Sequence, residues 1–373
     1  MPQQPVEAAS PKRTHRAWSL YVGSIAGIPV YLHFTFLLLL MFIGFVQAHS
    51  GQAVFGGLAL VIAVFASVAL HELGHALVAR SYGIKTDDIV LYPIGGVARL
   101  RSMGEKTQEF WIAVAGPSVN VVIATLIGIY LYFRGQLLLP QSIADEEAIL
   151  RLTFLQKLMI INIILVIFNL IPAFPMDGGR VLRSLLTLAM SKERATSIAA
   201  GVGQALAILF VLVGLLNGQV ILMFIGIFVF IAAGQESMAT KSQALMSGKR
   251  VRDAMITRFE VLNHGDSLGR AADLLLATSQ QDFPVMNGTE VLGVLGRKEL
   301  LQGLASLGRD HYVAQAMTRD FPRISPAEPL EHAFDQMRQA DGLPVLVLDG
   351  EKLVGYVNNE NLMEYLMIQQ LGK

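Results

Sequence analysis

Two histidines and a glutamate stand inside one of the most apolar runs of the chain. His71, Glu72 and His75 form the pattern H-E-x-x-H, and no charged residue occurs between positions 54 and 70. On a helix the two imidazoles share one face, one turn apart, so both can bind one tetrahedral Zn²⁺ while Glu72 accepts a proton from water at the metal. Ionisable groups at membrane depth are costly and usually functional. The spacing therefore predicts a zinc site with a carboxylate base beside it.

The composition places this site in a membrane protein. Of the 373 residues, 53% are hydrophobic and only 16% are charged, and the mean hydropathy is +0.51. These values are too apolar for an ordinary soluble domain. The formal net charge is zero, so nothing global indicates a nucleic-acid partner. The absence of cysteine excludes disulfides and thiolate ligands, and His, Asp or Glu must therefore hold any metal.

Six apolar runs approach or exceed the roughly 20 helical residues that cross a bilayer. They are 30–48, 54–79, 109–133, 154–174, 198–216 and 219–235. Lysine and arginine are enriched on the cytoplasmic flanks of membrane spans. With the N-terminus inside, the outer segments hold three such residues and the inner segments twelve, namely Lys12, Arg13, Arg16, Arg80, Lys85, Arg99, Arg101, Lys106, Arg180, Arg183, Lys192 and Arg194. This bias predicts a multi-pass protein of the cell (inner) membrane with both termini in the cytoplasm.

The N-terminal segment 1–20 is basic and lacks a compact apolar core with a cleavage site, so we expect a cytoplasmic tail and not a signal peptide. His33, in the first apolar run, is predicted to be a helix-packing residue. The connection 85–107 is too short and too polar to cross the membrane, and its apolar pieces predict two short strands around a turn. Gly95 and Gly96 of this hairpin are candidates for guiding a substrate. The alternative is a plain cytoplasmic connecting loop.

Two other segments put polar groups into apolar runs. Asn120 follows Gly116 in the third run, and the fourth run reaches Asn169 and two prolines just before Asp177. Prolines break the helix there, and non-helical backbone at membrane depth is tolerated where it lines a pocket. Asp177 is either a group of that pocket or a helix cap. Asn120 and Asn169 either bond neighbouring helices or position the substrate and its oxyanion.

After about residue 240 the chain changes character. Segments 249–307 and 313–370 repeat one order, in which a short opening and an amphipathic helix precede a Pro-Val strand, a Gly-containing strand and a second helix. A repeat of about 60 residues predicts two similar modules. The predicted fold is therefore an α-helical membrane domain at 21–238, with about six transmembrane helices and a small β-hairpin, followed by a cytoplasmic α/β tandem module.

These motifs together resemble the site-2 protease family of intramembrane zinc metalloproteases, in the branch that carries C-terminal CBS domains. The H-E-x-x-H pattern at 71–75 and N-x-x-P-x-x-P-x-D-G-G at 169–179 match two family motifs, and 116–120 is similar to a third. The resemblance covers the membrane body, and the tandem CBS modules cover nearly all of the remainder.

The resemblance implies roles for four side chains. His71, His75 and Asp177 would bind one zinc ion per chain, and Glu72 would act as general base and then as general acid. The implied reaction is hydrolysis of a peptide bond within or near the transmembrane helix of a single-pass membrane protein in the lipid bilayer. Competing functions are a CBS-regulated transporter or channel, which lacks support from any inverted hydropathy repeat, and a catalytically silent homologue.

The CBS pair departs from the pattern of nucleotide-binding modules. Such modules commonly carry G-h-h-[ST]-x-x-[DN] after the second strand. Here 293–299 has Gly296 at the hydroxyl position and Glu299 at the acidic one, and 355–361 also lacks the hydroxyl. Adenine-nucleotide binding, a regulatory lid and homodimerisation through the CBS modules remain alternative roles for this part of the chain.

Overall fold

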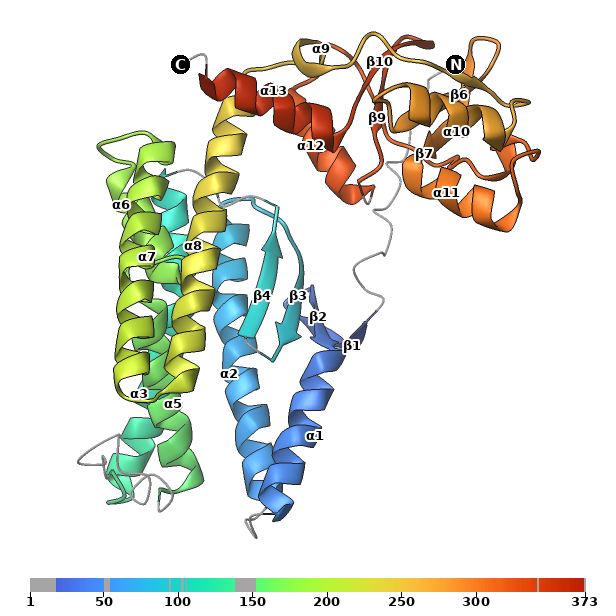
Figure 1. Ribbon diagram of the computed structural model, residues 1–373. Coiled ribbons are helices and arrows are strands. Elements are labelled where there is room, and N and C mark those ends of the chain that lie inside the picture. The colour runs from blue at the N-terminus through green and yellow to red at the C-terminus, as the bar shows by residue number, and fades with distance from the viewer. Residues whose placement is uncertain are drawn as a thin grey trace, which may run out of the picture. The chain divides into compact units, whose positions relative to one another are not determined.

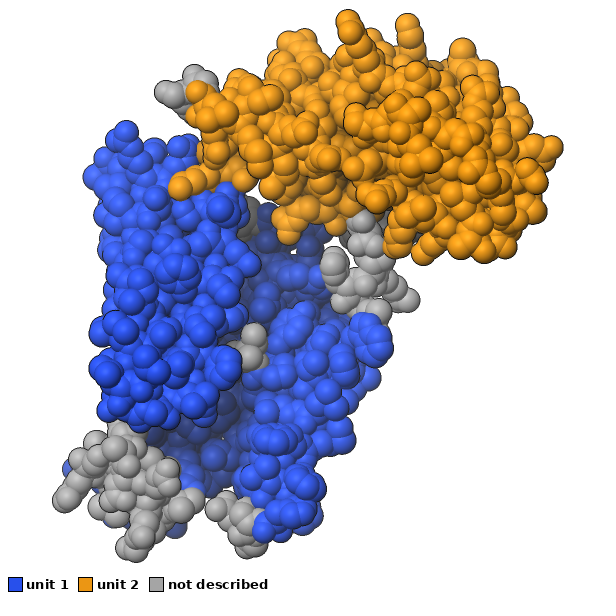
Figure 2. All heavy atoms as spheres, viewed as in Figure 1, with its two compact units in different colours: residues 1–240 blue, residues 241–373 orange. Residues whose placement is uncertain are grey.

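The chain divides into two compact units, Met1–Thr240 and Lys241–Lys373, which Figure 2 shows in different colours. The computed structural model describes residues 18–49, 54–93, 95–101, 104, 106–137, 152–340 and 342–371. The first unit contains the apolar helices and a small sheet, and the second contains the repeated modules (Figure 1).

Each of the six apolar runs contains a helix, and a further short helix follows the two prolines. These helices are α1 (Phe34–His49), α2 (Val54–Ser81), α3 (Lys106–Phe133), α5 (Phe154–Asn169), α6 (Asp177–Leu186), α7 (Lys192–Leu216) and α8 (Val220–Met246). Within the described residues, α2, α3, α7 and α8 are long and apolar enough to cross a membrane. The 16-residue helices α1 and α5 are only about 24 Å long against a hydrocarbon core of about 30 Å. A multi-pass membrane protein is confirmed, while a count of six spans stays a prediction.

A four-stranded sheet packs on α2 (Figure 1). Its strands are β1 (Ser19–Ile25), β2 (Ile28–His33), β3 (Thr86–Tyr92) and β4 (Gly95–Leu100), in that order, with β2 and β3 parallel and the other pairs antiparallel. The hairpin β3–β4 confirms the two strands expected in the connection. Apolar side chains on both sides close the contact between sheet and helix, among them Ile28, Val30, Ala69, Leu73, Ile89 and Leu91.

The sequence-based prediction missed the strands β1 and β2. The first apolar run was expected to be helical from residue 30, but residues 30–33 belong to β2 and the helix begins at Phe34. β1 also begins at Ser19, inside the expected tail. His33 is consequently a strand residue whose Nδ1 lies 2.7 Å from Thr35 Oγ1, so its prediction as a helix-packing residue was wrong. Mean hydropathy does not distinguish a short buried strand from a helix. In β2 the alternation of more and less buried residues, with a period of two, is the feature that indicates a strand.

The second unit consists of two three-stranded sheets flanked by helices. The first module has β5 (Leu262–Asn263), α10 (Leu268–Ala277), β6 (Asp282–Asn287), β7 (Glu290–Gly296) and α11 (Arg297–Ser306). The second has β8 (Arg323–Ile324), α12 (Leu330–Gln339), β9 (Val345–Asp349), β10 (Lys352–Val357) and α13 (Asn359–Leu371). The sheet orders β5-β6-β7 and β8-β9-β10 match, as the internal repeat predicts.

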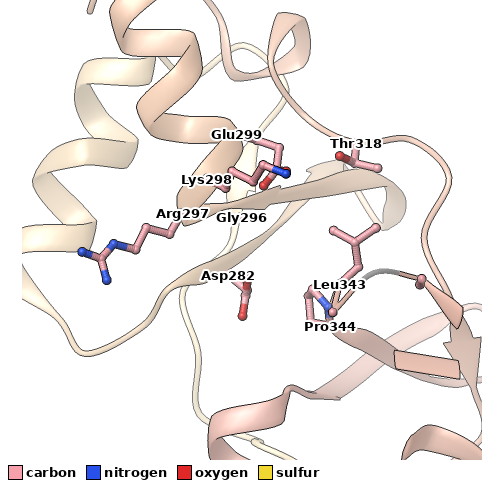
Figure 3. A pocket seen from close by; sticks show the side chains of 10 residues that line it. Asp282, Gly296, Arg297, Lys298, Glu299, Thr318, Leu343 and Pro344 are labelled. Atoms are coloured by element: carbon pink, nitrogen blue, oxygen red, sulfur yellow. The ribbon is translucent and has the colours of Figure 1, made fainter. Parts of the chain in front are cut away.

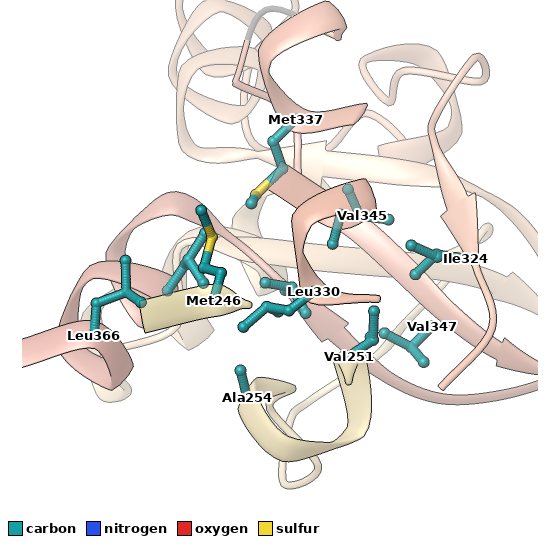
Figure 4. Close-up of a cluster of buried hydrophobic side chains, with 12 residues drawn as sticks. Met246, Val251, Ala254, Ile324, Leu330, Met337, Val345, Val347 and Leu366 are labelled. Carbon is teal, nitrogen blue, oxygen red and sulfur yellow. The ribbon is translucent and has the colours of Figure 1, made fainter. Parts of the chain in front are cut away.

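The opening segment of each module packs into the other module. Val251 and Ala254 of α9 (Val251–Ala254), which opens the first module, lie in one core with Leu330 and Val345 of the second (Figure 4). Reciprocally, Val313 and Met317 lie in the core of the first module. Because each module completes the hydrophobic core of the other, the pair folds as one unit.

Candidate metal centre

Three buried side chains from two helices meet at one point in the first unit. His71 and His75 lie one turn apart on α2, and Asp177 is the first residue of α6. Asp177 Oδ2 is 3.2 Å from Nε2 of each histidine. The two Nε2 atoms are 3.1 Å apart. Within the described part of the chain, this is the one group of His, Asp and Glu side chains that could hold a metal ion.

The other ring nitrogens show which atoms of this cluster carry protons. His75 Nδ1 lies 2.6 Å from the carbonyl oxygen of Ile112, which can only accept, so His75 donates from Nδ1. His71 Nδ1 lies 2.6 Å from the side-chain amide oxygen Oδ1 of Asn120 and donates to it. Both Nε2 atoms then present lone pairs to each other and to Asp177. Three such acceptor atoms facing one another at this distance could hold a cation between them.

The triangle has the dimensions of a zinc site. Ligand atoms 2.0–2.1 Å from a tetrahedral Zn²⁺ lie roughly 3.3–3.4 Å from one another. The observed separations of 3.1 and 3.2 Å come close to that edge length. Two imidazoles and a carboxylate also form a set of three protein ligands that leaves a fourth position open, as catalytic zinc sites do.

Gly116 on α3 leaves room for this site. A Cβ atom at this position would lie 2.6 Å from His71 Nε2 and closer still to His75 Nε2. Gly74 directly precedes His75 on α2, and a Cβ at this position would lie 2.9 Å from the carbonyl oxygen of Ala115. Glycine at both positions lets α2 and α3 approach until the α3 backbone borders His71 and His75. The close helix packing that Gly116 permits therefore occurs directly at the candidate metal site.

Asp177 reaches the histidines because the chain turns sharply after α5. Cβ atoms on Gly178 and Gly179 would collide with the backbone of residues 170–174, so only glycine lets the start of α6 pack against this turn. Met176 is the N-cap of α6, so Asp177 is the first residue inside the helix and not its cap. The alternative of a helix-capping Asp177 is therefore wrong, because its carboxylate is turned toward α2.

A buried ion cluster holds α6 in place. Arg183, 3% exposed, donates from Nε to Glu109 Oε1 on α3 at 2.8 Å and from Nη1 to Glu236 Oε1 on α8 at 2.5 Å. Its guanidinium group also lies over the ring of Phe174. Sequence reasoning missed this cluster, although a charge inside an apolar fold signals a partner. The cluster ties the helix that begins with Asp177 to its two neighbours.

Glu72 lies beside the cluster and faces the hairpin. Its Oε2 accepts a hydrogen bond of 3.0 Å from the backbone N–H of Ala98 on β4. A Cβ on Gly96 would lie 2.6 Å from Glu72 Cγ and 3.1 Å from Val68 Cγ1. Gly96 therefore permits the close approach of β4 to α2, and the hairpin predicted from the sequence borders the carboxylate directly.

Both units of the chain are similar to known protein families. The model of peptidase family M50 matches residues 59–149 and 135–212, and the CBS domain model matches 251–306 and 313–368. A zinc metalloprotease of Methanocaldococcus jannaschii is 31% identical over 95% of this chain and 98% of its own length. The chain belongs to peptidase family M50. This confirms the expected site-2 protease family, a peptidase and a C-terminal CBS module.

Other relatives extend the same likeness. A Synechocystis sp. protein named as a candidate zinc metalloprotease is 31% identical over 95% of this chain and 92% of its own length. The solved site-2 protease of Methanocaldococcus jannaschii is 38% identical, covers 59% of this chain and 95% of its own, and has a TM-score of 0.45.

The two candidate asparagines of this M50 peptidase have different surroundings. Asn120 is fully buried, and both ends of its amide are engaged, by His71 Nδ1 and by Asn162 Oδ1. It bonds neighbouring helices, and this geometry does not support contact with a substrate oxyanion. Asn169 is the last residue of α5, half-buried, and its side chain has no hydrogen-bond partner among the described residues.

The CBS unit contains a cavity of about 280 Å³. It is lined by Asp282, Gly296, Arg297, Lys298, Glu299, Thr318, Ala340, Gly342, Leu343 and Pro344 (Figure 3). Burial raises the pKa of Asp282; the hydrogen bond from Asn358 partly offsets this shift, and the nearby carboxylates of Glu299 and Glu360 add to it. A Cβ on Gly296 would lie 2.6 Å from Glu299 Oε2, so the carboxylate occupies the place of the missing hydroxyl.

Proposed function

We propose that this chain is an intramembrane zinc endopeptidase that hydrolyses a peptide bond within or near the transmembrane helix of a single-pass membrane protein. The observation that carries the proposal is the buried triangle of possible ligand atoms from His71, His75 and Asp177 in a multi-pass membrane body. Membership in a peptidase family favours this function over a transporter or channel.

The proposed mechanism assigns each group one task. His71, His75 and Asp177 would hold a zinc ion, which when bound would acidify a water molecule and polarise the scissile carbonyl. Glu72 accepts the proton of that water and passes it to the leaving amine. The hydrogen bond from Ala98 N–H to Oε2 holds the carboxylate of Glu72 in place for this transfer.

Metal analysis of the purified chain tests the proposal. We expect zinc at one ion per chain in the wild type and its loss in His71→Ala, because two ligands do not hold a catalytic zinc. His33→Ala is the matched control, since this histidine of the same unit bonds Thr35 outside the cluster. A wild-type protein that takes up no zinc would overturn the proposal, and with it the peptidase mechanism.

The hairpin β3–β4 is proposed to guide the substrate to Glu72. β4 is an edge strand of its sheet and touches the carboxylate through Ala98, so an extended substrate segment paired with this edge would pass the metal. Gly95 and Gly96 begin the strand, and Gly96 has no room for a side chain. Asn169 is proposed as a further substrate contact because its amide has no hydrogen-bond partner among the described residues.

Replacing Gly96 by valine is expected to lower cleavage at least about tenfold, because its side chain would push β4 away from Glu72 and a shift of about 1 Å can cost 100-fold. Zinc content should not change. Gly201→Val on α7 is the control, since a Cβ there meets nothing within 4 Å. Cleavage rates of a single-pass model substrate in vesicles measure the effect. Full activity after bulky replacement of both Gly95 and Gly96 would remove the guiding role.

The CBS unit is proposed to lie in the cytoplasm, together with both termini, and to regulate the peptidase. The cavity in this unit supports a ligand site. Because the unit consists of CBS domains, the candidate means of regulation are binding of an adenine nucleotide and homodimerisation. Arg297 and Lys298 suit phosphate, whereas Asp282 and Glu299 oppose it. The cell membrane is the proposed location, on the basis of the charge bias between the apolar runs.

A further inference from the structure

Asn162 on α5 is a fully buried amide that the proposed mechanism does not use. Its exposed fraction is 0%, in the middle of an apolar helix. Its Nδ2 donates to the carbonyl oxygen of Leu158 at 2.9 Å and to Ser67 Oγ at 3.3 Å. Its Oδ1 accepts from Asn120 Nδ2 at 2.8 Å. A side chain with so many buried contacts across three helices has a defined orientation.

The hydrogen bonds form a chain in which the donor and the acceptor of each bond are fixed by the bond before it. The carbonyl oxygen of Leu158 can only accept, so the amide nitrogen of Asn162 must point to it and the amide oxygen to Asn120. Asn120 must then donate to Asn162 and turn its own oxygen to His71 Nδ1. His71 donates from Nδ1 as a result, and its Nε2 keeps the lone pair that faces Asp177.

We propose that Asn162 is a positioning residue that selects the metal-binding tautomer of His71 by orienting the amide of Asn120. The proposal rests on the metal site proposed above. The two histidines differ in this respect, because His75 Nδ1 faces the backbone carbonyl of Ile112, which cannot turn around. His71 faces an amide, and an amide rotated by 180° would donate to Nδ1 and move the proton to Nε2, where it blocks the metal.

The test measures zinc affinity by competition with a chelator on the detergent-solubilised full chain, in a double-mutant cycle. Asn162→Leu is expected to weaken zinc binding about 10- to 100-fold, as loss of an outer hydrogen bond to a metal ligand does. In the Asn120→Asp background, the same replacement should not weaken zinc binding. A carboxylate accepts from His71 Nδ1 in either orientation, so it needs no partner to orient it.

Gln156→Leu is the matched control. Gln156 is also a buried polar residue of α5, but it bonds the backbone of Gln136 and the N-terminus of its own helix. We expect its zinc affinity to equal that of the wild type, and circular dichroism reports whether each variant is folded. Equal weakening by Asn162→Leu in both backgrounds, or none in the wild type, would overturn the orienting role. A folded wild type without zinc would instead overturn the metal site.

Discussion

Replacing Glu72 by glutamine is expected to reduce peptide hydrolysis at least about 100-fold, the usual contribution of a general base and acid, while zinc stays bound. Glutamine has the shape of glutamate but cannot take a proton from water. Its amide oxygen can still accept the hydrogen bond from Ala98 N–H that Glu72 Oε2 accepts, so β4 stays attached to α2. The loss should therefore appear in turnover and not in folding or metal content.

The measurement compares cleavage rates of a reconstituted single-pass substrate with zinc content for the same preparations. Glu193→Gln is the control, since this carboxylate is exposed in the first turn of α7. Retained activity in Glu72→Gln would contradict the assigned role. The inactive variant also serves as a trap, because a substrate that binds without being cleaved can be cross-linked and identified by mass spectrometry.

Replacing Gly116 by alanine is expected to weaken zinc binding about 10- to 100-fold, although it adds a single methyl group. The new Cβ would lie 2.6 Å from His71 Nε2 and closer to His75 Nε2. Both rings are held from behind by their Nδ1 hydrogen bonds and cannot simply turn away. Overpacking of this kind costs about 1–3 kcal/mol, which corresponds to the expected loss of affinity.

Gly128→Ala on the same helix is the control that separates the steric effect on the histidines from any effect of alanine on α3. A Cβ at Gly128 would lie 3.5 Å from Met159 Sδ, an ordinary contact. Alanine is also the better helix former, so both variants should keep α3 intact. Zinc affinity by chelator competition is the readout. Equal affinities for Gly116→Ala and Gly128→Ala would show that the α3 backbone does not border the metal ligands.

Local patterns in the sequence predicted the parts of this site that depend on local geometry. Helical spacing alone places His71 and His75 on one face with Glu72 beside them. The prolines after Asn169 predicted the break that α5 makes before Asp177. Hydropathy located the six apolar helices, and the internal repeat predicted the paired CBS modules. Hydropathy did not reveal β1 and β2, because an average over a window does not detect the two-residue alternation of a strand.

The polar contacts around the ligands could not be read from the sequence. Asn162 and Arg183 are single polar residues without a spacing that predicts a partner, and their partners on other helices lie between 42 and 95 residues away. Gly116 resembles any small residue that lets membrane helices pack. Its role depends on which side chains α2 presents at the crossing.

The sequence by itself therefore determined the candidate ligand types, the candidate base and the division into a membrane body and a CBS pair, because these follow from residue identity and local periodicity. Only the tertiary structure decided that Asp177 meets the histidines with its carboxylate, that Gly116 keeps their Nε2 atoms free, and that Asn120 faces His71 with its oxygen. Such relations depend on distances between helices. These distances arise when glycines and buried amides let α2, α3, α5 and α6 pack together.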